Sequence, residues 1–218
     1  MMEIHLSLNE SFCNCNTQII HSMAYTVFLS YGGKDNDLVS AINESLSRFS
    51  NIEVYIAEWI QMAGVPLEVK VRNGLDRSFA MIALITNNSI NSEWMQQEIG
   101  YATAKNRNII PIVEQGVNIE GFLEAKEYIP LERYNLDFCI YLIIHRLNTL
   151  IGSNQYFCNL GNLNFTCWSC NNKCSMIMPN QQNINETLEK HLVYNFTCQK
   201  CQKITNLDPM TFKPSPQY

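Results

Sequence analysis

Apolar and polar positions between residues 25 and 150 follow the pattern of strands that alternate with helices. Five strands are predicted from apolar runs at 25–31, 53–57, 79–85, 109–113 and 128–131. Helices are predicted where apolar residues recur at helical spacing, at 38–49, 67–75, 91–105, 120–125 and 134–150. Pro111 within the fourth run indicates a strand end. The alternation predicts an α/β fold with a flavodoxin-like, five-stranded parallel sheet that has helices on both faces.

Three predicted loops follow strands and should therefore meet at the carboxyl edge of the sheet, where parallel α/β sheets bind ligands. These loops span residues 30–35, 58–66 and 86–92. The third loop leads into a helix for which Asn91 and Ser92 are suitable N-cap residues. Ligand-binding side chains are therefore expected on these loops and on the first turns of that helix.

Glu98 is conspicuous on this helix because it lies between Trp94 and Tyr101, at the edge of an apolar face. That face is formed by Met95, Ile99 and Ala102. No basic residue stands three or four positions from Glu98, so the helix offers it no ion-pair partner. With a partner from another segment, Glu98 would be an ordinary surface carboxylate. Without one, apolar neighbours would raise its pKa and mark it as a candidate functional residue.

Several short segments, in this order and spacing, resemble a TIR domain over about residues 24–150. They are YTVFLSY at 25–31, the Gly/Lys/Asp turn after it, the loop that contains Gly64, the apolar strand at 79–85, Trp94-x-x-x-Glu98, and IIPI at 109–112. The sequence is most similar to bacterial and archaeal TIR proteins and shares the enzymatic signature of the animal axon-degeneration TIR NADase. The R-D-x-x-P-G signature of receptor-type members is absent from 58–66, which argues against a signalling-adaptor role.

The resemblance implies cleavage of the nicotinamide–ribose bond of NAD+, with release of ADP-ribose or a cyclic ADP-ribose isomer, in microbial relatives often as a defence signal. It also implies that Glu98 is the catalytic residue and that the site forms between self-associated protomers. Loss of nicotinamide leaves an oxocarbenium-like ribose, which a nearby carboxylate stabilises. Nicotinamide is already a cationic leaving group, so one carboxylate suffices, and the sequence shows no obvious second acid.

Further residues at the same edge are candidates for substrate binding. They are Ser30, Tyr31, Gly33, Lys34, Trp59 and Trp94. Tyr31 and Trp59 could stack on nicotinamide or adenine, whereas for Trp94 packing of the helix onto the sheet is the favoured role. Gly33 and Lys34 could approach a phosphate, although a Gly-Gly pair is more often only a turn. No G-x-G-x-x-G follows the first strand, so NAD+ is expected as a consumed substrate rather than a bound hydride carrier.

The cysteines indicate a metal site near the C-terminus. The motif NFTCWSC at 164–170 returns as NFTCQKC at 195–201. Two C-x-x-C pairs, Cys167/Cys170 and Cys198/Cys201, supply the four thiolates of a structural Zn2+ site of the ribbon type. Nine cysteines without an export signal favour metal over a disulfide framework. Cys174 is an alternative ligand, and free cysteines that meet by chance are the other interpretation.

The predicted organisation is an N-terminal extension at 1–22, a TIR domain at 23–150, a linker at 151–163, a zinc-ribbon-like β domain at 164–206 and a tail at 207–218. No secretory signal or transmembrane run is recognised, so a cytoplasmic protein without membrane contact is expected. The net charge is −5 with only 15 Lys and Arg, which makes nucleic acid an unfavoured partner. Besides the NAD+ nucleosidase, a non-catalytic TIR interaction scaffold and a zinc-ribbon nucleic-acid binder stay open.

Overall fold

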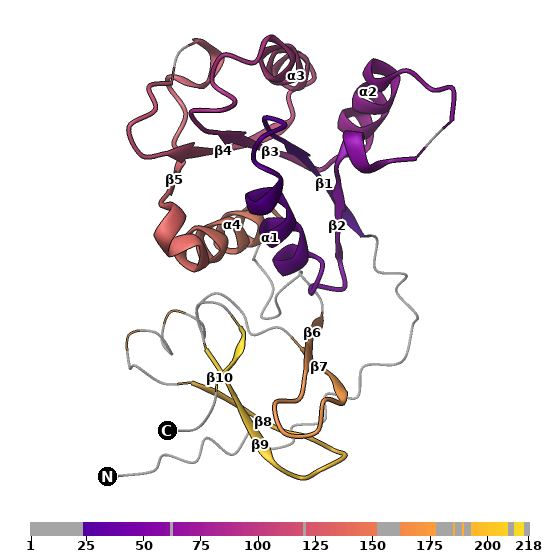
Figure 1. Cartoon of the computed structure of the whole chain (residues 1–218), viewed down its shortest axis with the longest axis vertical. Coiled ribbons are helices and arrows are strands. Elements are labelled where there is room, and N and C mark those ends of the chain that lie inside the picture. The colour runs from indigo at the N-terminus through magenta and orange to yellow at the C-terminus, as the bar shows by residue number, and fades with distance from the viewer. Residues whose placement is uncertain are drawn as a thin grey trace.

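A five-stranded parallel sheet forms the centre of the N-terminal domain (Figure 1). The computed structural model describes residues 24–61, 63–119, 121–151, 162–177, 185, 189, 193–208 and 212–215. The strands are β1 (Tyr25–Ser30), β2 (Ile52–Tyr55), β3 (Ala80–Ile85), β4 (Asn108–Glu114) and β5 (Ile129–Leu131). They pair in the order β2-β1-β3-β4-β5, so the order reverses beside β1. The predicted α/β fold with a flavodoxin-like parallel sheet is confirmed.

Helices cover both faces of the sheet, and their apolar sides form two cores. The helices are α1 (Asn36–Leu46), α2 (Leu67–Arg77), α3 (Glu93–Ala104) and α4 (Leu136–Ile151), with single 3-10 turns η1 (Ala57–Trp59), η2 (Gly121–Leu123) and η3 (Arg133–Asn135). α1 and α4 pack on one face, whereas α2 and α3 pack on the other (Figure 1). α2 approaches the sheet closely at Gly74, where a Cβ atom would stand 2.4 Å from the Tyr55 ring.

Two local predictions differ from the structure. Pro111 does not end a strand but lies in the middle of β4, opposite Ala83 of β3. β5 pairs with β4 only from Ile112 onward, so the chain at Pro111 has a strand neighbour on one side and tolerates the missing N–H. The helix predicted at 120–125 is reduced to the three-residue η2 among the described residues.

The C-terminal part is a small β region that carries the cysteines. β6 (Asn162–Thr166) pairs with β7 (Lys173–Ile177), and β8 (Tyr194–Thr197) pairs with β9 (Ile204–Leu207), both antiparallel. β10 (Pro214–Ser215) adds to β9. The predicted extension at 1–22 lies outside the described residues, as does most of the predicted linker.

This β region continues the core of the α1/α4 face rather than hanging free from it. Phe49, just after α1, forms an isolated antiparallel bridge with Leu163, and its ring meets Phe212 edge to face at 6.4 Å. The Arg48 guanidinium donates hydrogen bonds to the backbone oxygens of Phe212 and Asn164. Loss of order in the cysteine-bearing strands should therefore reach the N-terminal domain.

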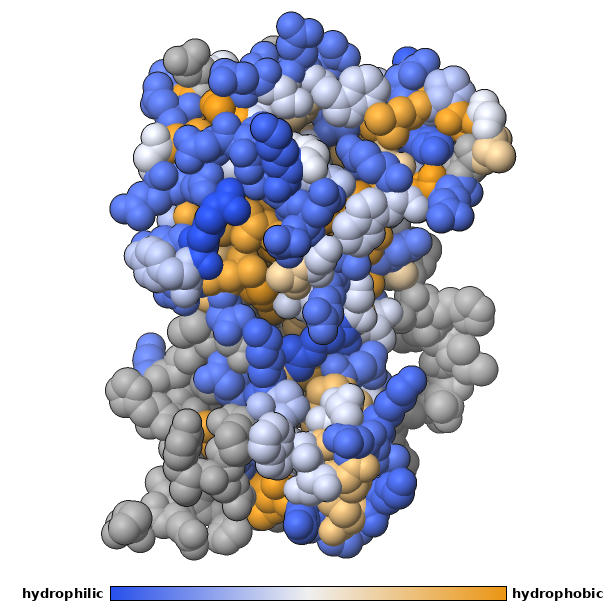
Figure 2. Space-filling view, viewed as in Figure 1, coloured by the Kyte–Doolittle hydropathy of each residue, from blue (hydrophilic) through white to orange (hydrophobic). Residues whose placement is uncertain are grey.

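The surface is mostly hydrophilic on the side seen in Figure 2, with hydrophobic side chains gathered over α1 and α4 and near α2. The exposed apolar residues of α2 include Leu67 and Val69. Within the described ranges, every helix is too short or too polar to cross a membrane.

Candidate active site

Glu98 lies at the carboxyl edge of the sheet, held between α3 and the end of β1. α3 begins as predicted after Ser92, whose side chain accepts a hydrogen bond from the Met95 backbone N–H. Two turns of helix then bring Glu98 against Ser30, the last residue of β1, and the Ser30 hydroxyl donates a short hydrogen bond to Glu98 Oε2. The helix itself offers Glu98 no partner, and its hydrogen-bond partner Ser30 lies 68 positions earlier, on β1.

The Glu98 side chain is buried, with only 4% of its surface exposed. Burial raises the pKa of Glu98 to about 7, although the hydrogen bond from Ser30 acts in the opposite direction. The negative charge of Glu58 raises this pKa further, and the Trp94 indole N–H lowers it. Trp94 Nε1 is buried without a hydrogen bond of good geometry to any described residue, so its effect is that of a nearby dipole. Near neutral pH, Glu98 thus exchanges between its neutral and charged forms.

Glu58 is a second carboxylate that the sequence did not single out. It lies on η1, in the loop after β2, and its side chain is exposed to solvent on one side. The protein atoms on its other side desolvate it enough to raise its pKa. Its charge acts on both Glu98 and Tyr31. Only the fold brings the three groups together, because β1, η1 and α3 are separate in sequence.

The three aromatic residues predicted to bind substrate differ in how far they are exposed near Glu98 and Glu58. Tyr31 is almost fully buried, and its hydroxyl donates to Asn36 Oδ1 at 3.1 Å. Burial raises the pKa of Tyr31, Glu58 raises it further, and the Trp59 side chain lowers it. Trp59 is 42% exposed on η1, so its ring is free to contact a ligand. Trp94 is half-buried and packs against the core under α2 and α3.

Gly33 and Lys34 are placed at the rim rather than beside Glu98. Both are exposed, and the Gly33 carbonyl accepts a hydrogen bond from Asn36 Nδ2 at 2.9 Å. The preceding Gly32 is the position that needs glycine, because a Cβ there would lie 2.8 Å from Ser89 Cβ. The Gly-Gly pair thus forms the turn between β1 and α1, packed against the loop after β3.

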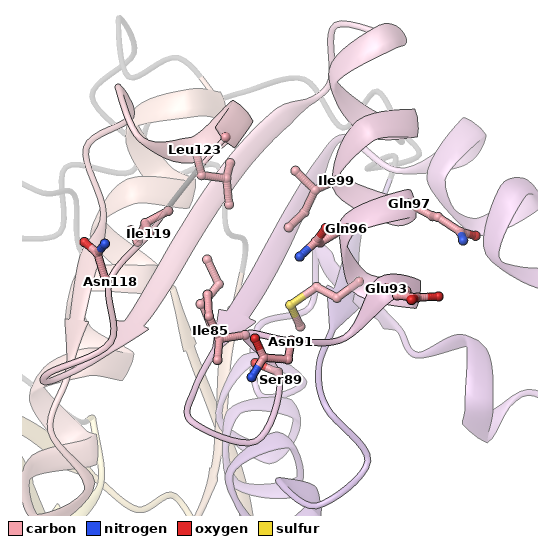
Figure 3. Close-up of a pocket in the computed structure, with 13 residues that line it drawn as sticks. Ile85, Ser89, Asn91, Glu93, Gln96, Gln97, Ile99, Asn118, Ile119 and Leu123 are labelled. Carbon is pink, nitrogen blue, oxygen red and sulfur yellow. The ribbon is translucent and has the colours of Figure 1, made fainter.

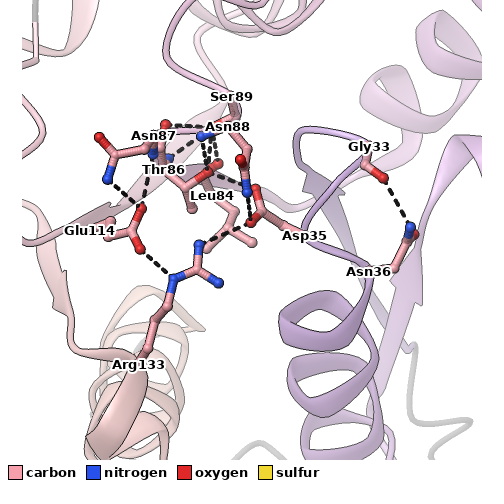
Figure 4. Close-up of polar contacts among 10 residues, drawn as sticks. All are labelled: Gly33, Asp35, Asn36, Leu84, Thr86, Asn87, Asn88, Ser89, Glu114 and Arg133. Carbon is pink, nitrogen blue, oxygen red and sulfur yellow. Dashed lines mark hydrogen bonds and ion pairs between the residues drawn. The ribbon is translucent and has the colours of Figure 1, made fainter.

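A polar network around the buried Asp35 and Thr86 joins the same loops to one another (Figure 4). Asp35 is 1% exposed and accepts hydrogen bonds from Thr86 Oγ1 at 2.6 Å and Asn88 Nδ2 at 2.8 Å. Arg133 forms an ion pair with Asp35 at 3.1 Å and another with Glu114. These residues follow or end β1, β3, β4 and β5. Polar residues placed directly after apolar runs were the sequence signal that could have revealed this network.

A cavity of about 730 Å³ opens beside α3, but Glu98 does not line it. Its walls come from the side of α3 that carries Met95 and Ile99, the loop after β3 and the segment before η2 (Figure 3). The candidate catalytic carboxylate is thus covered by Ser30 and its neighbours rather than lining this cavity.

The four predicted metal ligands converge in the C-terminal region. The sulfur atoms of Cys167, Cys170, Cys198 and Cys201 lie within 4.8 Å of one another. The Sγ atoms of Cys167 and Cys201 are 3.7 Å apart, as are those of Cys170 and Cys198. Zinc–thiolate bonds of about 2.3 Å in tetrahedral geometry place sulfurs about 3.8 Å apart, whereas a disulfide needs about 2.05 Å. The geometry fits a four-thiolate metal site.

Both C-x-x-C turns have the same backbone form. Asn171 and Gln202, each just after the second cysteine, have φ of 55° and 58°. Their N–H groups donate to the carbonyls of Cys167 and Cys198 at 3.0 and 2.8 Å. Burial raises the pKa of the Cys167 thiol, but the N–H groups of the turn outweigh it and bring this pKa to about 6. At Cys167 the turn therefore favours the thiolate form that binds metal. At Cys170 the Asn172 backbone lowers the pKa, but burial and the neighbouring cysteines outweigh it and raise this pKa to about 12.

Comparison with known proteins identifies a family for the N-terminal domain. The TIR domain family matches residues 27–138, just over half of the chain. No curated protein matches. Among solved structures, the TIR domain of the Toll-related receptor TRR-2 from Hydra magnipapillata is 14% identical with a TM-score of 0.49, over 56% of this chain and 97% of that one. The TIR domains of the activated Roq1 resistosome, which directly recognizes the pathogen effector XopQ, are 16% identical with a TM-score of 0.48, over 57% and 99%. The family match shows that the chain belongs to the TIR domain family.

Proposed function

We propose that the protein is an NAD+ nucleosidase that cleaves the nicotinamide–ribose bond and releases nicotinamide with ADP-ribose or a cyclic isomer. The observation that supports this most is the position of Glu98. It is a buried carboxyl group at the carboxyl edge of a parallel sheet, hydrogen-bonded to Ser30 and with a pKa of about 7. The resemblance seen in the sequence assigns the catalytic role to the same residue.

The proposed role of Glu98 is electrostatic. As nicotinamide departs, positive charge develops on the ribose, and a carboxylate at about 4 Å stabilises it by about 4 kcal/mol at an effective dielectric constant of about 20. The raised pKa means that burial opposes the charged form while the site is empty. A cationic substrate beside Glu98 lowers this pKa and favours the carboxylate. The exposed Trp59 ring lies at the same edge and would contact a planar group of NAD+, whereas Tyr31 is almost fully buried.

The test is incubation of the purified protein with NAD+, followed by chromatography of nicotinamide and ADP-ribose products. Glu98→Ala should abolish product formation. Glu93→Ala is the matched control, because Glu93 is an exposed acid on the first turn of the same helix. Equal product formation by wild type and Glu98→Ala would refute the proposal. The assay should include protein concentrations that favour self-association, since the resemblance implies a site shared between protomers.

A non-catalytic TIR interaction scaffold is the second candidate. The specific observation in its favour is that Ser30 covers Glu98 and that the cavity beside α3 does not reach it. For a scaffold, Glu98 would be a buried polar group satisfied by one hydrogen bond. Absence of nicotinamide release at every protein concentration, together with concentration-dependent self-association, would select this function.

We further propose that the four cysteines bind a structural Zn2+ ion and that residues 164–206 act as a zinc-ribbon-like unit beside the TIR domain at 23–150. The sulfur spacing and the paired turns support this. When bound, zinc would crosslink the β6–β7 and β8–β9 hairpins, and a site closed by four thiolates has no open position for catalysis. Metal analysis of the purified protein should give one zinc per chain, and Cys198→Ser should lower it.

A further inference from the structure

The cavity beside α3 is a second site, separate from Glu98. It has a volume of about 730 Å³, within the range of small-molecule pockets. Its apolar lining includes Ile85, Met95, Ile99, Ile119 and Leu123. Ile85, Met95 and Leu123 are buried side chains with at most 3% exposure, so these walls are part of the packed core and the cavity is formed in advance.

The cavity exists because little covers this side of α3. Among its described residues, the connection from β4 to β5 has one short element, η2, and Asn118, Ile119, Gly121 and Leu123 of this connection line the cavity. A full helix there would fill the space, but η2 leaves an opening that Met95 and Ile99 line, and Figure 3 shows Ile99 turned toward it. Glu98 lies on the same two turns of α3 and is directed toward Ser30 instead.

The polar groups of the cavity are the Ser89 hydroxyl, the Glu93 carboxylate and four carboxamides, those of Asn91, Gln96, Gln97 and Asn118. Asn91, Gln96 and Asn118 border it, and none of their side chains makes a hydrogen bond to a described residue. The Gln96 amide points into the space between α3 and the segment that carries Asn118 (Figure 3). Each free amide offers both a donor and an acceptor.

The charge of the lining disfavours anions. Among the described residues that line the cavity, Glu93 is the charged one, and Lys and Arg are absent. A phosphate or carboxylate ligand would find no cation among these residues, which favours a neutral occupant. Branched aliphatic walls and a methionine thioether suit a flat aromatic ring. Amides on facing walls suit a ligand edge with paired donor and acceptor groups, as in amide–adenine pairs.

We propose that this cavity binds a neutral, planar nitrogen heterocycle that carries a carboxamide or an exocyclic amino group. Nicotinamide and adenosine are two sources of this chemistry. The site is independent of turnover at Glu98, so the proposal holds whether or not the protein cleaves NAD+.

The experiment is a calorimetric or ligand-observed NMR titration of the full chain with nicotinamide, adenosine and nicotinate. At least one of the two neutral heterocycles should bind saturably, and nicotinate, the anionic analogue of nicotinamide, should not. Gln96→Leu should weaken binding about tenfold, because the loss leaves a ligand amide unpaired. Gln115→Leu is the matched control, because Gln115 is exposed and does not line the cavity, and it should bind as wild type does. Both glutamines are exposed, so neither change should disturb folding.

Glu98→Gln separates this site from the proposed catalytic one. Binding that persists in Glu98→Gln but weakens in Gln96→Leu supports the cavity. Binding that is lost in Glu98→Gln and unchanged in Gln96→Leu would place the ligand at Glu98 and overturn the proposal. Absence of saturable binding by both neutral compounds, or equal binding of nicotinate, would overturn it as well.

Discussion

The hydroxyl of Ser30 is the main group that favours the charged form of Glu98, and its removal gives a quantitative prediction. In Ser30→Ala the buried carboxylate loses a hydrogen bond that is worth about 1.5–3 kcal/mol to a charged acceptor. One pKa unit corresponds to about 1.4 kcal/mol, so the pKa of Glu98 should rise by roughly one to two units. The rise starts from a wild-type pKa of about 7, so the variant should titrate well above neutral pH.

The rate of NAD+ cleavage should follow this change, because the reaction needs the carboxylate. At pH 7 about half of wild-type Glu98 is ionised, and in Ser30→Ala the ionised fraction should fall to about a tenth or less. The assay is a pH profile of kcat/KM from nicotinamide release. Its acidic limb should shift upward by one to two units, with activity recovered at high pH. Ser30→Thr, which keeps a hydroxyl, should retain most of the wild-type profile.

A carbon-13 NMR titration of the Glu98 carboxyl supplies a readout without turnover. If Ser30→Ala leaves both this titration and the acidic limb unchanged, the hydrogen bond does not control Glu98 and the reasoning is wrong. A uniform loss of activity at all pH values would show that Ser30 acts by contacting substrate instead.

Three further changes test other parts of the account. Glu98→Gln should be more stable than wild type at pH 8, by up to about 3 kcal/mol in urea unfolding. The pKa of Glu98 lies near 7 in the folded protein and near 4.5 in the unfolded chain, so the stability of wild type falls as pH rises between these values. If the stability difference between Glu98→Gln and wild type is the same at pH 5 and at pH 8, this prediction is wrong. Chelation of bound metal should lower Tm by about 5–10 °C, which corresponds to a loss of roughly 2–3 kcal/mol of stability in a chain of this size. The Tm of Cys198→Ser should not fall further when chelator is added. An unchanged Tm of wild type with chelator would argue against a structural metal. Gly74→Ala should destabilise by roughly 1–3 kcal/mol, because its Cβ would meet the Tyr55 ring at 2.4 Å; thermal unfolding at wild-type Tm would show that α2 shifts at no cost.

The sequence predicted the sheet and the helices because their apolar patterns are strong. The run at 79–85 became β3, every residue of which is buried, and Ser92 became the N-cap of α3. Pro111 was misread because its position depends on where β5 begins, which is a tertiary fact. The helix at 120–125 was overpredicted because a short apolar pattern does not determine whether a helix or a single turn forms.

The candidate site was predictable only in part. Glu98 could be chosen from its apolar neighbours, but the Ser30 hydrogen bond joins residues 68 positions apart and leaves no local pattern. Glu58 was missed because an exposed loop acid has no periodicity, and only the fold brings its charge near Glu98. The cysteines were easier, since the spacing within each C-x-x-C fixes one turn and the repeat of the motif indicated that the two turns meet.

The most direct test of the central claim compares nicotinamide release by wild type, Glu98→Asp and Glu98→Gln at pH 8. Glu98→Gln keeps the shape of the side chain but removes its charge, whereas Glu98→Asp keeps the charge one methylene further away. The account predicts that Glu98→Gln loses about 10³-fold in kcat, the rate equivalent of about 4 kcal/mol, and that Glu98→Asp retains a measurable part of the rate. Turnover by Glu98→Gln at the wild-type rate would contradict the account.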